Sequence, residues 1–90
     1  MGAKYRPKYS WYWVYMLLCE NDSVYTGITT DVARRFAQHK AGKGGAYTRS
    51  HGAVRIIHVE RRVGRGRALR REAEIKKWTR EEKLAYARGS

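Results

Sequence analysis

The chain has 90 residues, which is the size of one small domain with a thin hydrophobic core. Twenty Lys and Arg face eight Asp and Glu, so the formal net charge is +12 and an anionic partner, most often nucleic acid, is expected. The single cysteine, Cys19, excludes an intramolecular disulfide and a cysteine-based zinc cluster, and it suits a reducing cytoplasm.

The first ten residues, MGAKYRPKYS, are basic and carry two tyrosines. They are expected to form an N-terminal arm over residues 1–10, followed by a single domain over residues 11–88. The arm lacks the apolar stretch of a signal peptide, and no later apolar run reaches the ~18 residues that span a membrane. A cytoplasmic location, associated with the nucleoid in a bacterium, and no membrane contact are therefore expected.

A β-hairpin is predicted next. Trp11 to Cys19 is apolar and rich in residues that favour strands, so it is expected to be a strand buried on both faces. Glu20 to Ser23 has the composition of a turn, and Val24 to Ile28 is the expected second strand. Gly27 within that strand indicates a bulge or a close approach of the backbone to another group.

A helix follows the hairpin. Thr30 is the expected N-cap, and Asp31 is favourable at the positive end of the helix dipole. The helix is predicted to run to about Ala41, with Gly42 ending it.

The rest of the chain is predicted to contain a glycine-rich basic loop at Gly42 to Gly52 and a third strand at Ala53 to Glu60. A basic turn at Val63 to Arg67 leads to a helix at Ala68 to Trp78. Thr79 to Ala87 starts a second helix or continues the first, because Thr-x-x-Glu can form a capping box. These elements predict an α/β (α+β) fold: a small three-stranded, mostly antiparallel sheet flanked by helices, in the order ββαβαα.

Four side chains in the first half of the chain are candidates for a site. Arg35 and His39 are four residues apart, so they share a helix face. Tyr15 and Tyr25 lie on strands that could pair. Taken one at a time, each has an ordinary structural explanation: a solvated arginine, a structural histidine and two strand tyrosines.

Glu72 lies on the helix predicted at Ala68 to Trp78. Its spacing places it in an apolar stripe with Ala68, Leu69 and Ile75. A carboxylate there is costly to bury unless it is paired or binds a metal. Two interpretations stay open: a salt bridge to one of the many arginines, or a site for a hard cation such as Mg²⁺.

Taken together, these residues resemble the GIY-YIG nuclease superfamily, and most closely its small, single-domain bacterial members of the UPF0213 type. The first motif matches WVY, which ends at Tyr15, and the second matches YTG, Tyr25 to Gly27. The family arginine and histidine match Arg35 and His39, and the metal-binding glutamate matches Glu72. The likeness covers roughly residues 11–83. The spacing Tyr-x-Gly-x₇-Arg-x₃-His carries its specificity.

The motifs depart from the family name at three positions. Trp13 and Val14 stand where the first motif has Gly and Ile, and Thr26 stands where the second has Ile. None of these three positions carries the chemistry. The asparagine that larger members have late in the domain has no match that we place in this chain.

The resemblance implies a metal-dependent endonuclease that hydrolyses phosphodiester bonds in single-stranded, branched or duplex DNA. Glu72 would hold a single Mg²⁺ or Mn²⁺, and Arg35 would clamp the phosphate. Tyr15 would be the general base, for which its pKa must fall from about 10 under adjacent positive charge. Tyr25 and His39 would orient water or relay protons. DNA repair is the pathway that the family suggests.

Further basic and aromatic residues are expected to bind the nucleic acid. Those near the glycine loop would follow the backbone or, for the aromatic ones, stack on unpaired bases, and those on the later helix widen the positive surface. The predicted binding residues are Lys40, Lys43, Tyr47, Arg49, His51, Arg65, Arg67, Arg70, Arg71 and Lys76.

Two alternatives to a self-sufficient enzyme stay open. The chain could be a nucleic-acid-binding module without catalysis, or a subunit whose nuclease activity needs a protein partner. RNA satisfies the same electrostatic requirement as DNA. The sequence predicts no oligomeric state.

Overall fold

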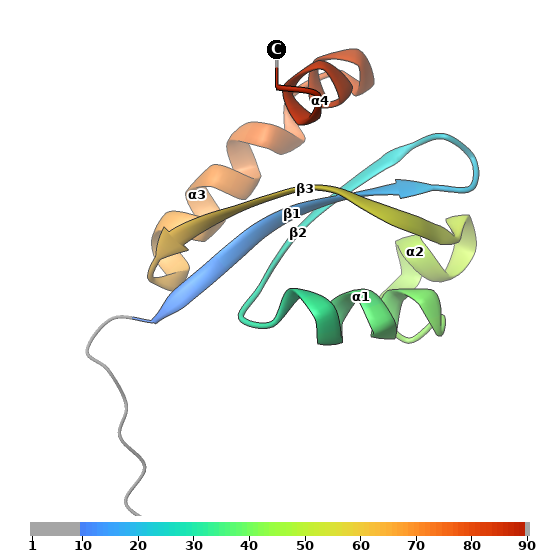
Figure 1. Ribbon diagram of the computed structural model, residues 1–90, viewed down its shortest axis with the longest axis horizontal. Coiled ribbons are helices and arrows are strands. Elements are labelled where there is room, and N and C mark those ends of the chain that lie inside the picture. The colour runs from blue at the N-terminus through green and yellow to red at the C-terminus, as the bar shows by residue number, and fades with distance from the viewer. Residues whose placement is uncertain (1–9, 90) are drawn as a thin grey trace, which may run out of the picture.

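The computed structural model describes residues 10–89, so all of the predicted N-terminal arm except Ser10 lies outside the described residues, and the division into arm and domain stays a prediction. The described part of the chain folds into three strands and four helices (Figure 1). In chain order they are β1 (Trp11–Cys19), β2 (Val24–Thr29), α1 (Val32–Lys40), α2 (Ala46–His51), β3 (Ala53–Val63), α3 (Arg65–Lys76) and α4 (Arg80–Ala87).

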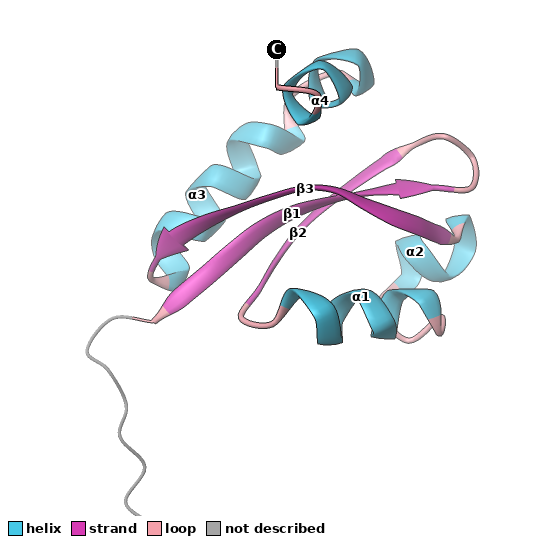
Figure 2. Cartoon of the chain, viewed as in Figure 1, coloured by secondary structure: helices cyan, strands magenta, loops and turns pink. Residues whose placement is uncertain are grey.

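The three strands form one antiparallel sheet in the order β2-β1-β3 (Figure 2). β1 is the central strand, and four consecutive residues, Val14 to Leu17, are buried in it. Neighbours on both edges and helices on both faces bury the middle of β1, which explains its apolar composition, whereas Trp11 at its start is 50% exposed. The predicted fold class is confirmed, and so is burial on both faces for Val14 to Leu17.

Each face of the sheet has its own core. α1 and α2 lie on one side of the sheet, and α3 and α4 lie on the other (Figure 1). Since successive strand residues point to opposite faces, β1 contributes alternately to the two cores. On the α3 side the buried cluster is Val14, Met16, Val24, Ala68 and Ile75. On the α1 side it is Tyr15, Leu17 and Ala53, with Tyr25, Phe36 and Ile56 packed against it.

Asp31, and not the predicted Thr30, caps the start of α1. Its carboxylate accepts a hydrogen bond from the backbone N–H of Arg34 at 3.1 Å, and the negative charge favours the positive helix end. At the other end Gly42 adopts a φ of 77°, and the Lys43 N–H donates to the carbonyl of Gln38 at 2.8 Å. This Schellman geometry explains why a glycine follows the helix, as predicted.

Three segments differ from their predicted extents. The glycine-rich loop contains a short additional helix, α2. β3 continues to Val63, because its last residues pair with the start of β1 and no local pattern reveals that ladder. Gly64 alone, with a φ of 84°, then separates β3 from α3. The predicted basic turn is therefore the end of β3 and the first turn of α3, which begins at Arg65 and not at Ala68. α3 and α4 are separate helices, and the capping box predicted at Thr79 is present with Glu82.

None of the helices within residues 10–89 has the length and apolar character that crossing a membrane requires.

Thr26 is a buried residue whose hydroxyl has no hydrogen-bond partner among the described residues. The side chain is only 3% exposed and lies on β2 opposite Met16. A buried polar group without a partner costs about 1–3 kcal/mol of stability. An apolar residue of the same shape would suit this position better than threonine.

We predict that Thr26→Val raises the free energy of unfolding by about 1 kcal/mol, because valine removes the unpaired hydroxyl and keeps the strand preference. Urea denaturation measures the change. Thr48→Val is the matched control: Thr48 is also buried, but its hydroxyl contacts His39 at 2.6 Å, so this variant should lose stability. A Thr26→Val protein less stable than the parent would contradict the prediction.

Candidate active site

Four of the five predicted catalytic residues lie together on the α1 side of the sheet. The register pairs Tyr15 with Gly27 and Leu17 with Tyr25, so the two tyrosines point to the same face two positions apart. Their ring centroids are 6.2 Å apart, and the ring of His39 lies 5.2 Å from that of Tyr25. The Tyr15 hydroxyl and His39 Nε2 are 2.8 Å apart in a buried hydrogen bond.

Gly27 makes room for the Tyr15 hydroxyl. A Cβ built on Gly27 would lie 2.7 Å from that oxygen and 2.9 Å from the ring carbon that bears it. A side chain at this position would therefore displace Tyr15. The close backbone approach expected at Gly27 is confirmed, and Tyr15 is the group that approaches.

His39 is held by two residues that the sequence analysis did not single out. Its Nδ1 lies 2.6 Å from the hydroxyl of Thr48, and both residues are buried. Gly44 packs so closely against the His39 ring that a Cβ there would overlap it. Nothing in the sequence around Thr48 indicates that α2 turns this residue toward α1.

The tautomer of His39 sets the direction of its two hydrogen bonds, because the hydroxyls of Thr48 and Tyr15 can each donate or accept. A neutral imidazole carries one N–H and one acceptor nitrogen. When Nδ1–H donates to Thr48, Nε2 accepts the hydrogen bond from the Tyr15 hydroxyl. Burial lowers the pKa of His39, and the nearby Arg35 charge lowers it further, which favours the neutral ring.

The pKa of Tyr15 is raised, which corrects the expectation that it would fall. Burial raises it to about 12, and the neighbouring guanidinium of Arg35 opposes this rise without overcoming it. Desolvation dominates because the hydroxyl is enclosed by the sheet and by α1. A free phenolate is therefore disfavoured, and Tyr15 can give up its proton only toward an acceptor such as His39.

Arg35 is fixed by neutral acceptors. Its Nη1 donates to the side chain of Gln38 at 3.0 Å, and its Nη2 donates to the carbonyl of Gly44 at 2.7 Å. No carboxylate within residues 10–89 forms an ion pair with it. Its charge is thus available at a polar pocket of about 160 Å³, which Thr29, Thr30, Asp31, Arg34, Arg35 and Gln38 line.

Glu72 is the fifth predicted residue, and no described hydrogen bond or ion pair joins it to the other four. It lies on α3, which packs on the opposite face of the sheet from α1. Its side chain is 17% exposed, and Lys76 Nζ lies 3.3 Å from the carboxylate. Glu72 is therefore in a salt bridge, as one of the two interpretations expected, but its partner is a lysine one helical turn away and not an arginine.

The donor set around Glu72 fits some metals and not others. No group of three or more His, Cys, Asp or Glu side chains gathers anywhere within residues 10–89. Zinc sites need three or four protein ligands, so they do not fit. A single, partly buried carboxylate suits Mg²⁺ or Mn²⁺, which can take their other ligands from water and phosphate oxygens. Its present partner Lys76 is 54% exposed and free to move aside.

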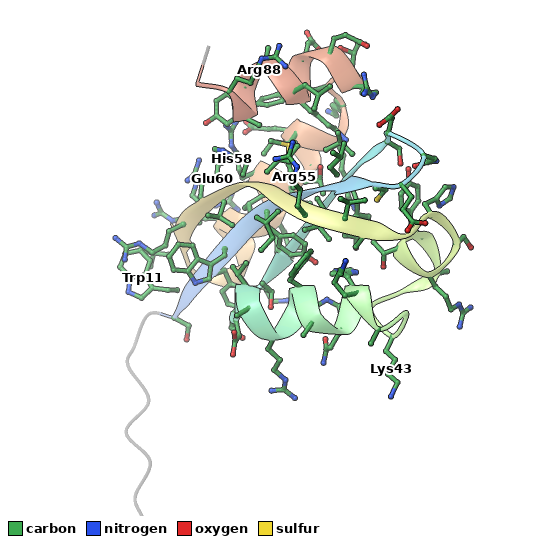
Figure 3. The ribbon with its side chains drawn as sticks, turned by 45° about the vertical axis from the view of Figure 1, so that its right-hand side comes forward. Trp11, Lys43, Arg55, His58, Glu60 and Arg88 are labelled. Atoms are coloured by element: carbon green, nitrogen blue, oxygen red, sulfur yellow. The ribbon has the colours of Figure 1, made fainter. Side chains whose placement is uncertain are left out.

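The predicted base-stacking residues form a continuation of the tyrosine cluster. The Tyr47 and His51 rings are stacked with centroids 4.2 Å apart, and Tyr47 lies 5.7 Å from Tyr25. The Tyr47 side chain is 40% exposed, so aromatic rings lead from the buried Tyr15 to the surface. Lys43 lies in the loop after α1, and its side chain points away from the fold (Figure 3). Arg49 is exposed on α2.

Arg71 differs from the other predicted binding residues of α3. Arg65, Arg67 and Arg70 are exposed, whereas the Arg71 side chain is only 18% exposed. It donates hydrogen bonds to Glu60, Glu74 and Tyr86.

Glu60 lies on β3 next to His58 (Figure 3). Burial opposes its ionisation, but hydrogen bonds from Arg71, His58 and Tyr86 hold its pKa at about 2. The charge of Arg71 is thus neutralised inside the fold, and this arginine ties α3 to the sheet.

Comparison with known proteins identifies one family over most of the chain. The model of the GIY-YIG catalytic domain matches residues 11–85. A UPF0213 protein of Cupriavidus necator is 49% identical over 77 residues, which is 86% of this chain and 83% of that protein. A UPF0213 protein of Haloquadratum walsbyi is 48% identical over 77 residues, covering 86% of both chains.

Two solved structures have the same fold. The solution structure of a UPF0213 protein from Bacillus halodurans superposes with a TM-score of 0.52 at 39% identity, covering 84% of this chain and 81% of that one. The solution structure of a protein from E. faecalis gives a TM-score of 0.57 at 35% identity, covering 96% and 90%.

We predict that Gly44→Ala destabilises the protein by about 1–3 kcal/mol, because the added methyl overpacks against His39. Gly66→Ala is the matched control. The space around Gly66 is open to 3.8 Å, and alanine in helix α3 should raise stability by about 0.5–1 kcal/mol. Urea denaturation of both variants measures the change in the free energy of unfolding. Equal effects of the two substitutions would mean that the contact between Gly44 and His39 is not tight.

We also predict that His39 titrates below its ordinary value of 6.5, which the pH dependence of its Cε1–H resonance measures. A pKa lowered by folding means that the unfolded chain binds more protons. Stability is then complete above pH 6.5 and falls as the pH drops toward the folded-state pKa. A midpoint at or above 6.5 would show that the ring is protonated in its contacts with Tyr15 and Thr48.

Proposed function

The chain belongs to the GIY-YIG catalytic domain family, and from this premise we propose that it is a metal-dependent DNA endonuclease acting on single-stranded or branched DNA. The observation that carries the proposal is the buried hydrogen bond between Tyr15 and His39 beside Arg35, with which no carboxylate of residues 10–89 forms an ion pair. Phosphodiester hydrolysis needs a proton acceptor for water and a positive charge at the phosphate, and this cluster offers both. A cytoplasmic location stays a prediction and agrees with the free cysteine, Cys19.

Tyr15 and His39 act as a relay for the proton of the attacking water. The Tyr15 oxygen accepts the proton of the water while its own proton passes to Nε2 of His39. Because both transfers occur together, the tyrosine need not form a free phenolate, which its pKa of about 12 disfavours. The relay uses the tautomer in which Nδ1–H donates to the Thr48 hydroxyl, 2.6 Å away, and Nε2 accepts from Tyr15. Tyr25, against the ring of His39, orients the water.

Arg35 binds the phosphate of the scissile bond. A guanidinium has five N–H donors, and contacts to Gln38 and Gly44 use only part of them. Those two contacts also fix its plane, so little conformational entropy is lost when it grips a phosphate. The remaining donors stabilise the charge that grows on the phosphate oxygens in the transition state.

Glu72 would hold the single Mg²⁺ or Mn²⁺, whose chemistry, when bound, is to neutralise phosphate charge and stabilise the leaving oxygen. Binding requires the Glu72 carboxylate to exchange its ion pair with Lys76 for the cation. Lys76 then remains near the nucleic-acid backbone as a further positive charge.

The substrate strand is held by the surface around the cluster. Lys40, Lys43 and Arg49 follow its phosphates, and the stacked pair Tyr47 and His51 offers rings to unpaired bases. On α3 the exposed residues Arg65, Arg67 and Arg70 extend the positive surface. An unpaired strand suits these aromatic rings, because bases in a duplex are already stacked on each other.

A second candidate function is a nucleic-acid-binding module that cleaves only with a protein partner, or not at all. The observation that favours it is the position of Glu72, which is paired with Lys76 and has no described contact with Tyr15, Arg35 or His39. A partner could supply the missing carboxylate. Such a protein would bind DNA or RNA without metal, and its affinity would follow salt concentration alone.

We predict that end-labelled single-stranded and forked DNA is cleaved with Mg²⁺ or Mn²⁺ and not with EDTA. Glu72→Gln should abolish cleavage and retain binding, because it removes the metal ligand and keeps the size of the side chain. Glu74→Gln, on the same helix with its carboxylate 65% exposed, is the matched control and should remain active. Salt-sensitive binding without cleavage under any condition would favour the binding module.

We further predict that Tyr15→Phe lowers kcat by about 10²–10⁴-fold, the usual contribution of a positioned acid or base. Tyr12→Phe is the control, since Tyr12 lies on the same strand but packs against the opposite core. Single-turnover cleavage measures both. In the parent protein, the cleavage rate should fall as the pH is lowered, because protonated His39 cannot accept the proton of Tyr15. Unchanged activity in Tyr15→Phe would contradict the relay.

A further inference from the structure

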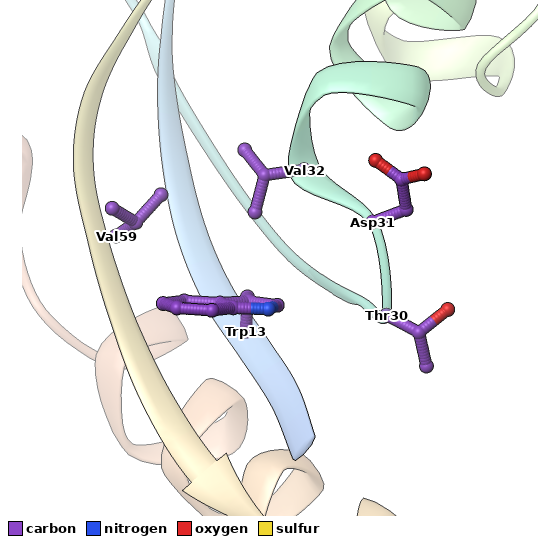
Figure 4. A pocket seen from close by; sticks show the side chains of 5 residues that line it. All are labelled: Trp13, Thr30, Asp31, Val32 and Val59. Carbon is purple, nitrogen blue, oxygen red and sulfur yellow. The ribbon is translucent and has the colours of Figure 1, made fainter. Parts of the chain in front are cut away.

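A pocket separate from the tyrosine cluster lies between the sheet and the start of α1. Its volume is about 380 Å³, and Trp13, Val32, Val59, Thr30 and Asp31 line it (Figure 4). This volume is within the range of about 300–1,000 Å³ that small-molecule sites occupy. The indole of Trp13 and the two valines form apolar walls, and Thr30 and Asp31 bound the pocket on the other side with side chains that point away from Trp13 (Figure 4).

The apolar walls continue onto an exposed aromatic surface. Trp11 and Trp13 point to the same face of β1, and Arg61 on β3 lies over both rings, 4.0 Å and 5.8 Å from their centroids. Trp11 is 50% exposed and Val59 is 41% exposed. Large apolar side chains gathered in this way usually mark a binding surface. Aromatic rings beside a guanidinium favour a partner that is both flat and anionic.

The pocket also adjoins the polar pocket that contains Arg35. Thr30 and Asp31 line both pockets, so they form the wall between them. A group bound against Trp13 would lie next to a phosphate bound at Arg35. The Asp31 carboxylate has one oxygen in the cap of α1, where it accepts the N–H of Arg34.

We infer that this pocket binds one unpaired nucleobase of the DNA strand whose phosphate contacts Arg35. The base stacks on Trp13 between the two valines. Every base has a π face that can stack on an indole, so the pocket selects unpaired strands without selecting a sequence. The inference rests on the proposed function and adds the feature that recognises single-stranded character.

The charge of the molecule favours this occupant over a second copy of the chain. Two molecules that each carry a formal charge of +12 repel one another. A duplex is also excluded from the pocket, because its bases are stacked and paired. A single strand satisfies both the positive surface and the apolar walls.

Binding in EDTA tests the inference without cleavage. The probes are a short single-stranded oligonucleotide, an abasic strand with the same number of phosphates, and a duplex. Trp13→Ala should weaken binding of the single strand on the order of ten-fold, which is the usual effect of losing one base–aromatic stack. Its affinity for the abasic strand and for the duplex should not change. Equal losses on all three probes, or no loss on any, would overturn the inference.

A matched pair on β3 tests the other wall. Val59 lines the pocket and Val54 does not, yet both are valines with nearly the same exposure, 41% and 40%. Val59→Glu and Val54→Glu add the same charge and remove the same side chain. Only Val59→Glu should lose the preference for the base-bearing strand over the abasic strand. An equal loss in both variants would show that charge alone acts.

Fluorescence of the parent pocket keeps the test valid if Trp13→Ala does not fold. With Trp11→Phe and Trp78→Phe, Trp13 is the only tryptophan, and stacking of a base should quench its emission while the abasic strand should not. Emission that depends on protein concentration instead would identify a second copy in the pocket. A change in emission when residues 1–9 are removed, without any added strand, would identify the chain's own N-terminus as the occupant of the pocket. Either result overturns the inference.

These experiments separate the two proposals. If Glu72→Gln abolishes cleavage while Trp13→Ala leaves every affinity unchanged, the endonuclease proposal stands and the base pocket is wrong. If no substrate is cleaved but Trp13→Ala affects only the base-bearing strand, the pocket is supported and the endonuclease proposal fails.

Discussion

The arrangement of the candidate site depends on one buried hydrogen bond, between Tyr15 on β1 and His39 on α1. Two glycines permit it. Gly27 lets the tyrosine hydroxyl lie against the backbone of β2, and Gly44 lets the loop after α1 close over the imidazole. The carbonyl of Gly44 also accepts a hydrogen bond from Arg35, so the same backbone segment positions two side chains. Several contacts thus fix each side chain of this region, as a preorganised site requires.

Burial also shifts the pKa values of these side chains. It raises the pKa of Tyr15 and lowers that of His39, so both shifts favour the neutral form of the side chain. Arg35 has no carboxylate partner among residues 10–89, and its guanidinium lines a pocket that an anion can enter.

The opposite face of the sheet uses charge differently. Arg71 lies over the rings of Trp78 and Tyr86 and is hydrogen bonded to Glu60, which is 11% exposed. A buried ion pair is tolerated only when further hydrogen bonds satisfy it, and Tyr86 and His58 supply them. Arg71 thus holds α3 and α4 against the sheet, whereas most of the other basic side chains lie at the surface.

Local pattern in the sequence predicted what depends on neighbouring residues: three strands, the helix ended by Gly42, the capping box at Thr79, and the shared helix face of Arg35 and His39. It did not predict α2, the length of β3, the partners of His39, or the internal pairing of Arg71. Tertiary structure decided these features, because each depends on contacts between residues distant in the chain. The rise in the pKa of Tyr15 belongs with them, since desolvation is set by the whole packed fold and not by the motif that contains the residue.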